Sequence, residues 1–143
     1  MTQDQLEDPW VNNWLAEMSA SEMGDWGRAL AVAAILGAAA DLAAADPARV
    51  QALAASPARE SRKLSRRLVE NAHAADQWLR AGLDWSWPDN GPGVPLTLAR
   101  CCLWLGLESP AVARAVLVDP EGVIERASRE GLQGAVRVSR QAA

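Results

Sequence analysis

The amino-acid sequence predicts an all-α protein, a compact bundle of about five to seven helices. Five of its eight prolines directly follow an Asp or a Ser, in the pairs Asp8-Pro9, Asp46-Pro47, Ser56-Pro57, Ser109-Pro110 and Asp119-Pro120. The Asp or Ser side chain can accept a hydrogen bond from a free amide of the first helical turn, and proline fits the first helical position because no N–H is needed there. The period-two alternation of strands is absent from the sequence. The chain is therefore expected to divide into helices around one long loop.

The first expected helix covers residues 9–18, whose apolar residues recur at the spacing of one helical face. They are Val11, Trp14, Leu15 and Met18, with Trp10 at the edge. A second helix is expected to begin near Ser19, which has capping-box spacing to Glu22, and to continue to Ala45. Because its middle is apolar almost all round, we expect other helices to surround it, with Gly37 allowing one of them to approach closely.

A short helix from Pro47 to Ala55 is expected next, followed by the best-defined helix, from Pro57 to about Arg80. Gly82 is a suitable residue to end it. Its expected buried stripe consists of Leu64, Leu68, Ala72, Ala75 and Leu79. The sequence therefore predicts that this helix packs along its whole length.

Residues 83–94 have the composition of a loop, because turn-forming Pro, Gly, Asn and Asp residues crowd into them. An apolar helix is expected from Pro95 to Leu105, ended by Gly106. Trp78 and Trp104 fall among apolar helical neighbours and are expected in the core.

Two short helices are expected at the end of the chain, after Pro110 and after Pro120. Gly131 and Gly134 are expected to fray the last helix into a mobile, basic tail, because glycine in a helix interior is unfavourable.

The length of 143 residues fits one domain over residues 1–143. Two proline pairs ten residues apart, however, occur twice in the chain. They are Asp46-Pro47 with Ser56-Pro57, and Ser109-Pro110 with Asp119-Pro120, and a long apolar segment precedes each set. One interpretation is a pair of degenerate helical repeats with solenoid-like packing, with halves 20–82 and 95–139 joined by the loop 83–94. The other interpretation is coincidence in an Ala- and Pro-rich chain.

The charges are unevenly distributed along the chain. Six acidic residues precede the first basic residue, Arg28, and they are Asp4, Glu7, Asp8, Glu17, Glu22 and Asp25. Five basic residues then crowd the start of the helix from Pro57, and they are Arg59, Arg62, Lys63, Arg66 and Arg67. Positive charge at a helix N-terminus opposes the helix dipole, which indicates an external reason for the cluster. The formal net charge of −4 argues against nucleic acid as that partner.

The acidic start of the chain does not have the pattern of a signal peptide. The longest apolar run, residues 29–45, is interrupted by Asp41 and is shorter than the roughly 20 residues that a bilayer span needs, so we expect a buried core helix and no membrane contact. Cys101 and Cys102 are adjacent and suit a reducing compartment. A cytoplasmic location is therefore expected, and the Arg-rich, Lys-poor composition is typical of a GC-rich bacterial genome.

Few residues could carry chemistry. Glu70 and His73, with Asp76 nearby, have a spacing that can hold a metal ion from one helix face, but His73 is the only histidine of the chain. Cys101 or Cys102 could act as a nucleophile next to a basic group. The alternative function is a helical protein that depends on a small ligand or metal bound by Glu70, His73 and Asp76. A thiol enzyme that uses Cys101 or Cys102 is the other form of this alternative. We expect neither a cofactor nor a catalytic site.

Two tryptophans, Trp85 and Trp87, fall within the polar loop 83–94, where they either cover the end of the core or anchor a partner. The function that we expect is a non-enzymatic protein-interaction module of the adaptor, immunity or secretion-accessory type. Its contact surface would join these tryptophans to the basic cluster and would bind an acidic partner surface. Self-association through exposed tryptophans is left open.

Overall fold

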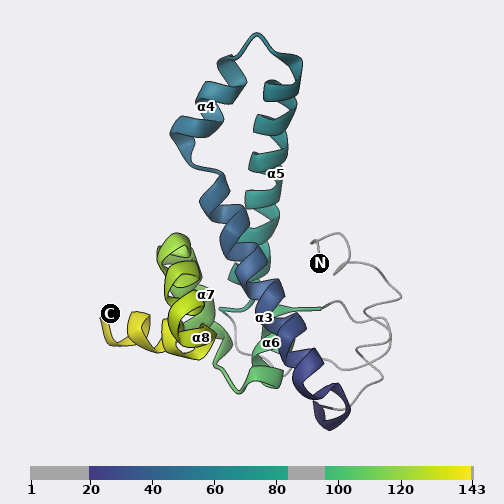
Figure 1. The fold of residues 1–143 in the computed structure, drawn as a ribbon, viewed down its shortest axis with the longest axis vertical. Helices are drawn as coiled ribbons and strands as arrows, with labels where there is room; N and C mark the ends of the chain where they lie inside the picture. The colour runs from purple at the N-terminus through teal and green to yellow at the C-terminus, as the bar shows by residue number, and fades with distance from the viewer. Residues whose placement is uncertain (1–19, 84–95, 143) are drawn as a thin grey trace.

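The computed structural model describes residues 20–83 and 96–142, and these two stretches contain helices and no strand (Figure 1). The prediction of an all-α bundle is confirmed. The expected helix over residues 9–18 and the tryptophans Trp85 and Trp87 lie outside the described residues. The helices are α3 (Ala20–Ala44), α4 (Pro47–Ala55), α5 (Arg59–Ala81), α6 (Leu98–Leu105), α7 (Ser109–Val118) and α8 (Pro120–Ala142).

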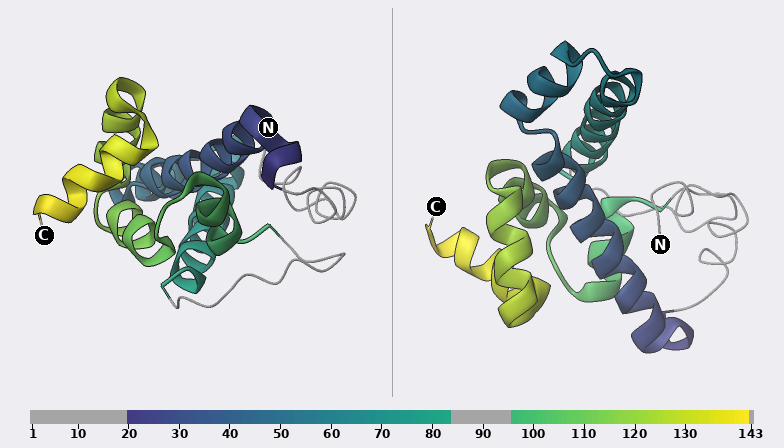
Figure 2. Two further views of the ribbon diagram at one scale, coloured as in Figure 1. Left: turned by 90° about the horizontal axis from the view of Figure 1, so that it is seen from below. Right: turned by 45° about the horizontal axis from the view of Figure 1, so that its top comes forward.

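Helix α3 runs through the middle of the molecule and contacts α5, α6, α7 and α8. Helix α4 packs almost entirely on α5. The views of Figures 1 and 2 show that α4 and the first half of α5 project beyond the other helices as a two-helix hairpin. We call this hairpin, residues 47–69, the arm.

The core lies below the arm and is built by five of the six described helices. Trp78 is half-buried against this core, and its indole Nε1 donates a hydrogen bond to the backbone carbonyl of Leu96 at 2.9 Å. This bond fixes the start of the second described stretch on α5. Fully buried side chains from each of the five helices are Ile35, Leu79, Leu98, Val112 and Val123.

Two of the predicted Asp-Pro helix starts are confirmed. The Asp46 carboxylate accepts a hydrogen bond from the amide of Arg49 at 3.2 Å and caps α4. The Asp119 carboxylate accepts one from the amide of Gly122 at 3.0 Å at the start of α8. In both places proline occupies the first helical position, as the sequence predicts.

The two Ser-Pro pairs act differently from the prediction. Ser56 ends α4, and its hydroxyl accepts a hydrogen bond from the amide of Ala58, so that α5 begins at Arg59 rather than at Pro57. Ser109 is buried within the first turn of α7, where its hydroxyl donates to the carbonyl of Gly82 at 2.6 Å. The hydroxyl of Ser109 therefore joins two helices instead of capping one.

Two glycines end helices for different reasons. Gly106 adopts the left-handed conformation (φ 69°) after α6, as predicted for a glycine C-cap. Gly82 has ordinary helical angles, but a Cβ at this position would collide with the Leu98 side chain and would lie 2.6 Å from Oγ of Ser109. The close approach of α5 to α6 and α7 therefore requires a glycine here.

The prediction of a mobile tail after Gly131 is wrong for the residues up to Val136. Gly131 has non-helical angles (φ 81°, ψ 166°) and bends α8, and the helix then continues. Leu132, Ala135 and Val136 are buried, and the side-chain amide of Gln133 donates to the carbonyl of Leu105 at 3.1 Å. The glycine changes the direction of α8 so that its second part also packs on the core.

Two expectations about burial also need correction. Along α5, Ala75 and Leu79 are buried, but Leu64 and Leu68 are only half-buried, because α4 alone covers that part of the helix. On α3, Gly37 is exposed, and a Cβ built on it would meet nothing within 4 Å. Helix α3 therefore packs on one side only, and Gly37 lies on the other side.

Within the described residues, one helix is long and apolar enough to cross a membrane by length and composition. It is Gly27–Ala44 in α3, with a mean hydropathy of 1.5, of which 39% is buried in the fold. Helices α6 and α7 meet the same criterion only as a pair, with a bend of 114° between them.

Candidate functional site: the basic arm

The arm is held together by a narrow apolar seam. Helix α4 packs on α5, and the half-buried apolar residues of the two helices in the arm include Val50 and Leu53 on α4 and Leu64 and Leu68 on α5. No residue of α4 is fully buried. Ser65 is the one buried residue of the arm's α5 half, and its hydroxyl donates to the carbonyl of Val50 at 3.0 Å. Among the described helices, the arm therefore consists of two, with no third to complete a core.

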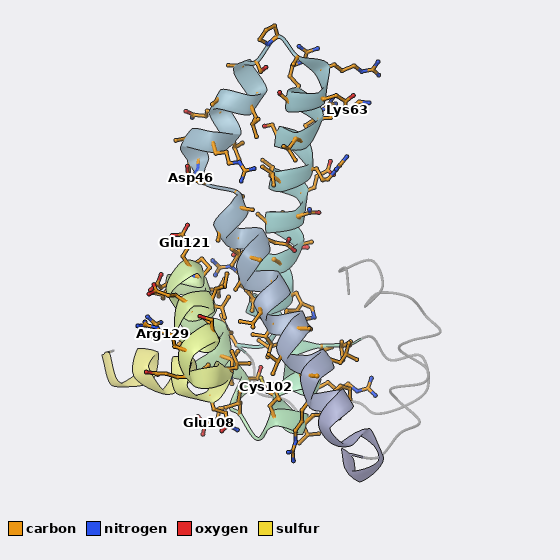
Figure 3. The ribbon with its side chains drawn as sticks, in the orientation of Figure 1. Asp46, Lys63, Cys102, Glu108, Glu121 and Arg129 are labelled. Atoms are coloured by element: carbon orange, nitrogen blue, oxygen red, sulfur yellow. The ribbon has the colours of Figure 1, made fainter. Side chains whose placement is uncertain are left out.

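The five predicted basic residues all lie on the arm, and all five are exposed. At 100° per residue, Arg59, Arg62 and Arg66 lie on the face of α5 opposite to Leu64 and Leu68. Lys63 lies beside this face, and Arg67 lies between it and Leu64. Figure 3 shows Lys63 pointing outward from α5, away from α4. The basic face is therefore turned to solvent along the outer side of the arm.

Two of the five basic side chains already have partners within the arm. Lys63 Nζ lies 3.8 Å from a carboxylate oxygen of Glu60. The Arg62 guanidinium donates to the carbonyl of Pro57 at 2.8 Å and to that of Ser56 at 3.3 Å. Arg62 thus fixes the turn between α4 and α5, a structural role that the sequence did not indicate.

The other three arginines make no such contact. Within residues 20–83 and 96–142, Arg59, Arg66 and Arg67 form no ion pair and no hydrogen bond through their side chains. A guanidinium group without an ion pair can bind a carboxylate of another molecule. The basic face therefore carries three guanidinium groups that have no acidic partner in the part of the chain that the structure describes.

Two further exposed residues of the arm were left out of the sequence analysis. Arg49 is exposed on α4 and adds a further positive charge to the arm. Val69, one turn beyond Arg66, is 50% exposed, a high value for a branched apolar side chain. The apolar Val69 within a charged helix was the signal that could have identified it.

The described part of α5 separates the basic face from the residue at which the tryptophan loop begins. Leu83, the last described residue before that loop, is sixteen positions after Arg67, which is about 24 Å along a helix. Trp85 and Trp87 follow Leu83 in the chain and lie outside the described residues.

The candidate metal ligands do not converge. Glu70 and His73 are exposed on α5, and Asp76 accepts a hydrogen bond from Nε of Arg80 at 2.9 Å. The part of the chain that the structure describes has no group of three His, Cys, Asp or Glu residues that could hold a metal ion. This geometry does not favour a metal function for the three residues.

Both cysteines are buried in α6, and their surroundings disfavour the thiolate. Burial raises the pKa of Cys101 above its ordinary value, an effect that the Arg100 guanidinium only partly offsets. Burial also raises the pKa of Cys102, to about 12. Arg100 itself is 1% exposed, with its guanidinium carbon 5.7 Å from the ring centre of Trp104. Nucleophilic chemistry requires a thiolate near neutral pH, so this arrangement disfavours it.

The chain matches no known family model, and neither the curated proteins nor the solved structures contain a match to it.

Proposed function

We propose that the protein is a non-enzymatic interaction module that binds an acidic surface of another protein through the basic face of its arm. The observation that carries the proposal is the presence of Arg59, Arg66 and Arg67, exposed and without ion pairs among the described residues, on a hairpin that adds little to the core. A stability role would place such charges next to acids or at a helix C-terminus. Arg59, at the first position of α5, opposes the helix dipole at a small cost in stability, which an external partner would offset.

The chemistry of the arm fits docking of a protein surface. Arginine forms paired hydrogen bonds to carboxylates, and a row of positive charges speeds the encounter with an acidic partner. Val69, 50% exposed, adds apolar area beside these charges. Charge would select and orient the partner, and apolar contact would slow its dissociation.

The cellular role that we propose remains of the adaptor, immunity or secretion-accessory type, in the cytoplasm of a bacterium. The small-ligand, metal or thiol alternative has less support, because Glu70, His73 and Asp76 do not converge and both thiols are buried with raised pKa values. Trp85 and Trp87 stay in the proposal as a second contact region of the same partner.

The experiment is site-specific photocrosslinking in a lysate of the native host, with a benzophenone amino acid at one of two exposed valines. Val69 lies on the arm, and Val118, 84% exposed at the end of α7, is the matched control. The benzophenone at position 69 should form an adduct with one partner, at an acidic peptide of that partner. The benzophenone at position 118 should form no such adduct. Raising the salt concentration from about 0.1 M to about 1 M shortens the Debye length from about 10 Å to about 3 Å and should reduce the adduct.

Equal adducts from both valines, or a yield at position 69 that salt does not change, would contradict the proposal. A crosslinked peptide without acidic residues would contradict it as well.

A further inference from the structure

Helix α5 carries a line of exposed residues that repeats every seven positions. Arg59, Arg66, His73 and Arg80 follow one another at this interval from the first turn of the helix to the last, and all four are exposed. Seven residues complete almost two helical turns, so each of these residues lies only about 20° around the helix from the one before it. They therefore form one line along α5, which we call the outer stripe.

The outer stripe faces away from the helices that pack on α5. Leu64 and Leu68 are half-buried on the inner side of the helix, and Ala75 and Leu79 are buried there. At 100° per residue, the stripe lies roughly opposite to these four residues. Figure 1 shows α4 on one side of the arm half of α5 and no described helix on the other side. No helix in the described part of the chain therefore covers the stripe along the arm.

The stripe combines positive charge with an exposed apolar side chain. Arg59 and Arg66 have no acidic partner in the part of the chain that the structure describes. Val69, 50% exposed, lies one turn after Arg66 at the edge of the stripe. At the far end Arg80 is already paired with Asp76, with 2.9 Å between Nε and the carboxylate oxygen. The positive charge that a partner can reach is therefore concentrated on the arm half of the stripe.

The spacing of these charges matches a second helix better than an extended chain. Seven residues of an α-helix rise about 10.5 Å, which is the separation of Arg59 and Arg66 along α5. A helix lying along α5 presents side chains at the same seven-residue interval. An extended strand returns to the same face every two residues, or about every 6.6 Å, and no multiple of this repeat equals 10.5 Å. Acidic residues seven positions apart on one helix could therefore meet both arginines at once.

We propose that the acidic partner of the arm contributes an α-helix that lies along the outer stripe of α5. Two acidic residues of that helix, seven positions apart, would pair with Arg59 and Arg66, and an apolar residue beyond them would cover Val69. This inference rests on the function proposed for the arm and adds the form in which the partner presents its acidic surface.

Two adjacent charge reversals test the stripe. Arg67 directly follows Arg66 on the same exposed part of α5, but it is turned away from the stripe by about 100°. Binding of the purified partner protein that is crosslinked through position 69 is measured for Arg66→Glu and for Arg67→Glu, which change the net charge equally. Arg66→Glu should raise Kd by about tenfold, because it replaces a charge pair by a repulsion. Arg67→Glu should raise Kd by no more than about threefold, because it acts only through the screened field of the arm.

Crosslinks from two positions on α5 test whether the bound segment is helical. Val69 and Gln77 are both exposed and are eight positions apart, about 12 Å along the helix. Benzophenone at these two positions should label residues of the partner that are about eight positions apart if its segment is helical. An extended segment would be labelled at residues about four positions apart. Gln51, exposed on α4, is the matched control for Gln77 and should give no label in this segment.

A larger effect of Arg66→Glu than of Arg67→Glu, together with labels about eight positions apart, supports the proposal. Equal increases in Kd, or labels about four positions apart, would overturn the helical partner and leave the arm as a docking surface. If neither substitution changes Kd, both the helical partner and the function proposed for the arm are wrong. Circular dichroism of each variant establishes that the helical fold is kept.

Discussion

At the scale of single residues, the two cysteines illustrate how burial controls chemistry. Burial raises the pKa of both thiols, to about 12 for Cys102, so the thiol form is the one present at pH 8. We therefore predict that neither Cys101 nor Cys102 reacts with an aromatic disulfide reagent in the folded protein at pH 8. Both should react at once in guanidinium chloride. Stoichiometric labelling without denaturant would show that α6 opens or that the thiols are ionised.

The close contact at Gly82 gives a second residue-scale prediction. A methyl group there would strike Leu98 and crowd the Ser109 hydroxyl, so Gly82→Ala should lower the free energy of unfolding by about 1–3 kcal/mol, as overpacking does. Gly37→Ala is the comparison, because the same methyl group meets nothing within 4 Å. Helix propensity should make that variant more stable by about 0.5–1 kcal/mol.

Urea denaturation of the two glycine variants checks this prediction. Opposite signs are expected. A loss at Gly37 equal to that at Gly82 would mean that glycine is needed for its backbone freedom at both positions.

At the scale of helices, the sequence was most informative where a local bond determines the structure. Asp46 and Asp119 cap α4 and α8 as predicted, because an Asx side chain reaches the amide three residues on. Ser109 escaped prediction because its hydroxyl partner, Gly82, lies 27 residues away in the chain. The bend at Gly131 was not predicted for the same reason. Only the packing of Leu132 and Val136 on the core shows that α8 bends and continues.

The packing of the arm could not be predicted from the sequence. The spacing of Leu64, Leu68, Ala75 and Leu79 defines one face of α5 but does not reveal how many helices cover it. The five basic residues were correctly placed on one exposed helix. The carbonyl contacts of Arg62 depend on the geometry of the α4–α5 turn, which the sequence pattern does not contain.

Uneven burial along α5 predicts an uneven cost of truncation. Leu79 is fully buried, and Leu79→Ala should cost about 2–5 kcal/mol of unfolding free energy, as in other core sites. Leu68→Ala removes the same atoms from the half-buried seam and should cost less, because less apolar surface leaves contact. Chemical denaturation of both variants compares them directly, and equal costs would mean that the arm is covered by a further element.

At the scale of the whole molecule, shape and charge divide the protein into two parts. Five helices share the core, while the arm carries the basic face away from it (Figure 1). The net charge is −4, so the arm is a positive region on an acidic protein. Its field would orient an approaching acidic partner toward the arm, and this effect should weaken with salt.

The most direct test of the arm as a docking surface is the affinity of the partner crosslinked through position 69. It is measured for the wild type and for two double variants with the same change in net charge. One is Arg66→Glu with Arg67→Glu on the arm, and the other is Arg114→Glu with Arg129→Glu on α7 and α8, at exposed residues away from it. Circular dichroism establishes that both variants keep the helical fold.

The arm variant should raise Kd by about tenfold or more and make it less dependent on salt, because attractive charge pairs are replaced by repulsive ones. The α7 and α8 variant should change Kd by less than about twofold, as expected for charges outside an interface. Equal changes in Kd for the two variants, or wild-type affinity in the arm variant, would contradict the account.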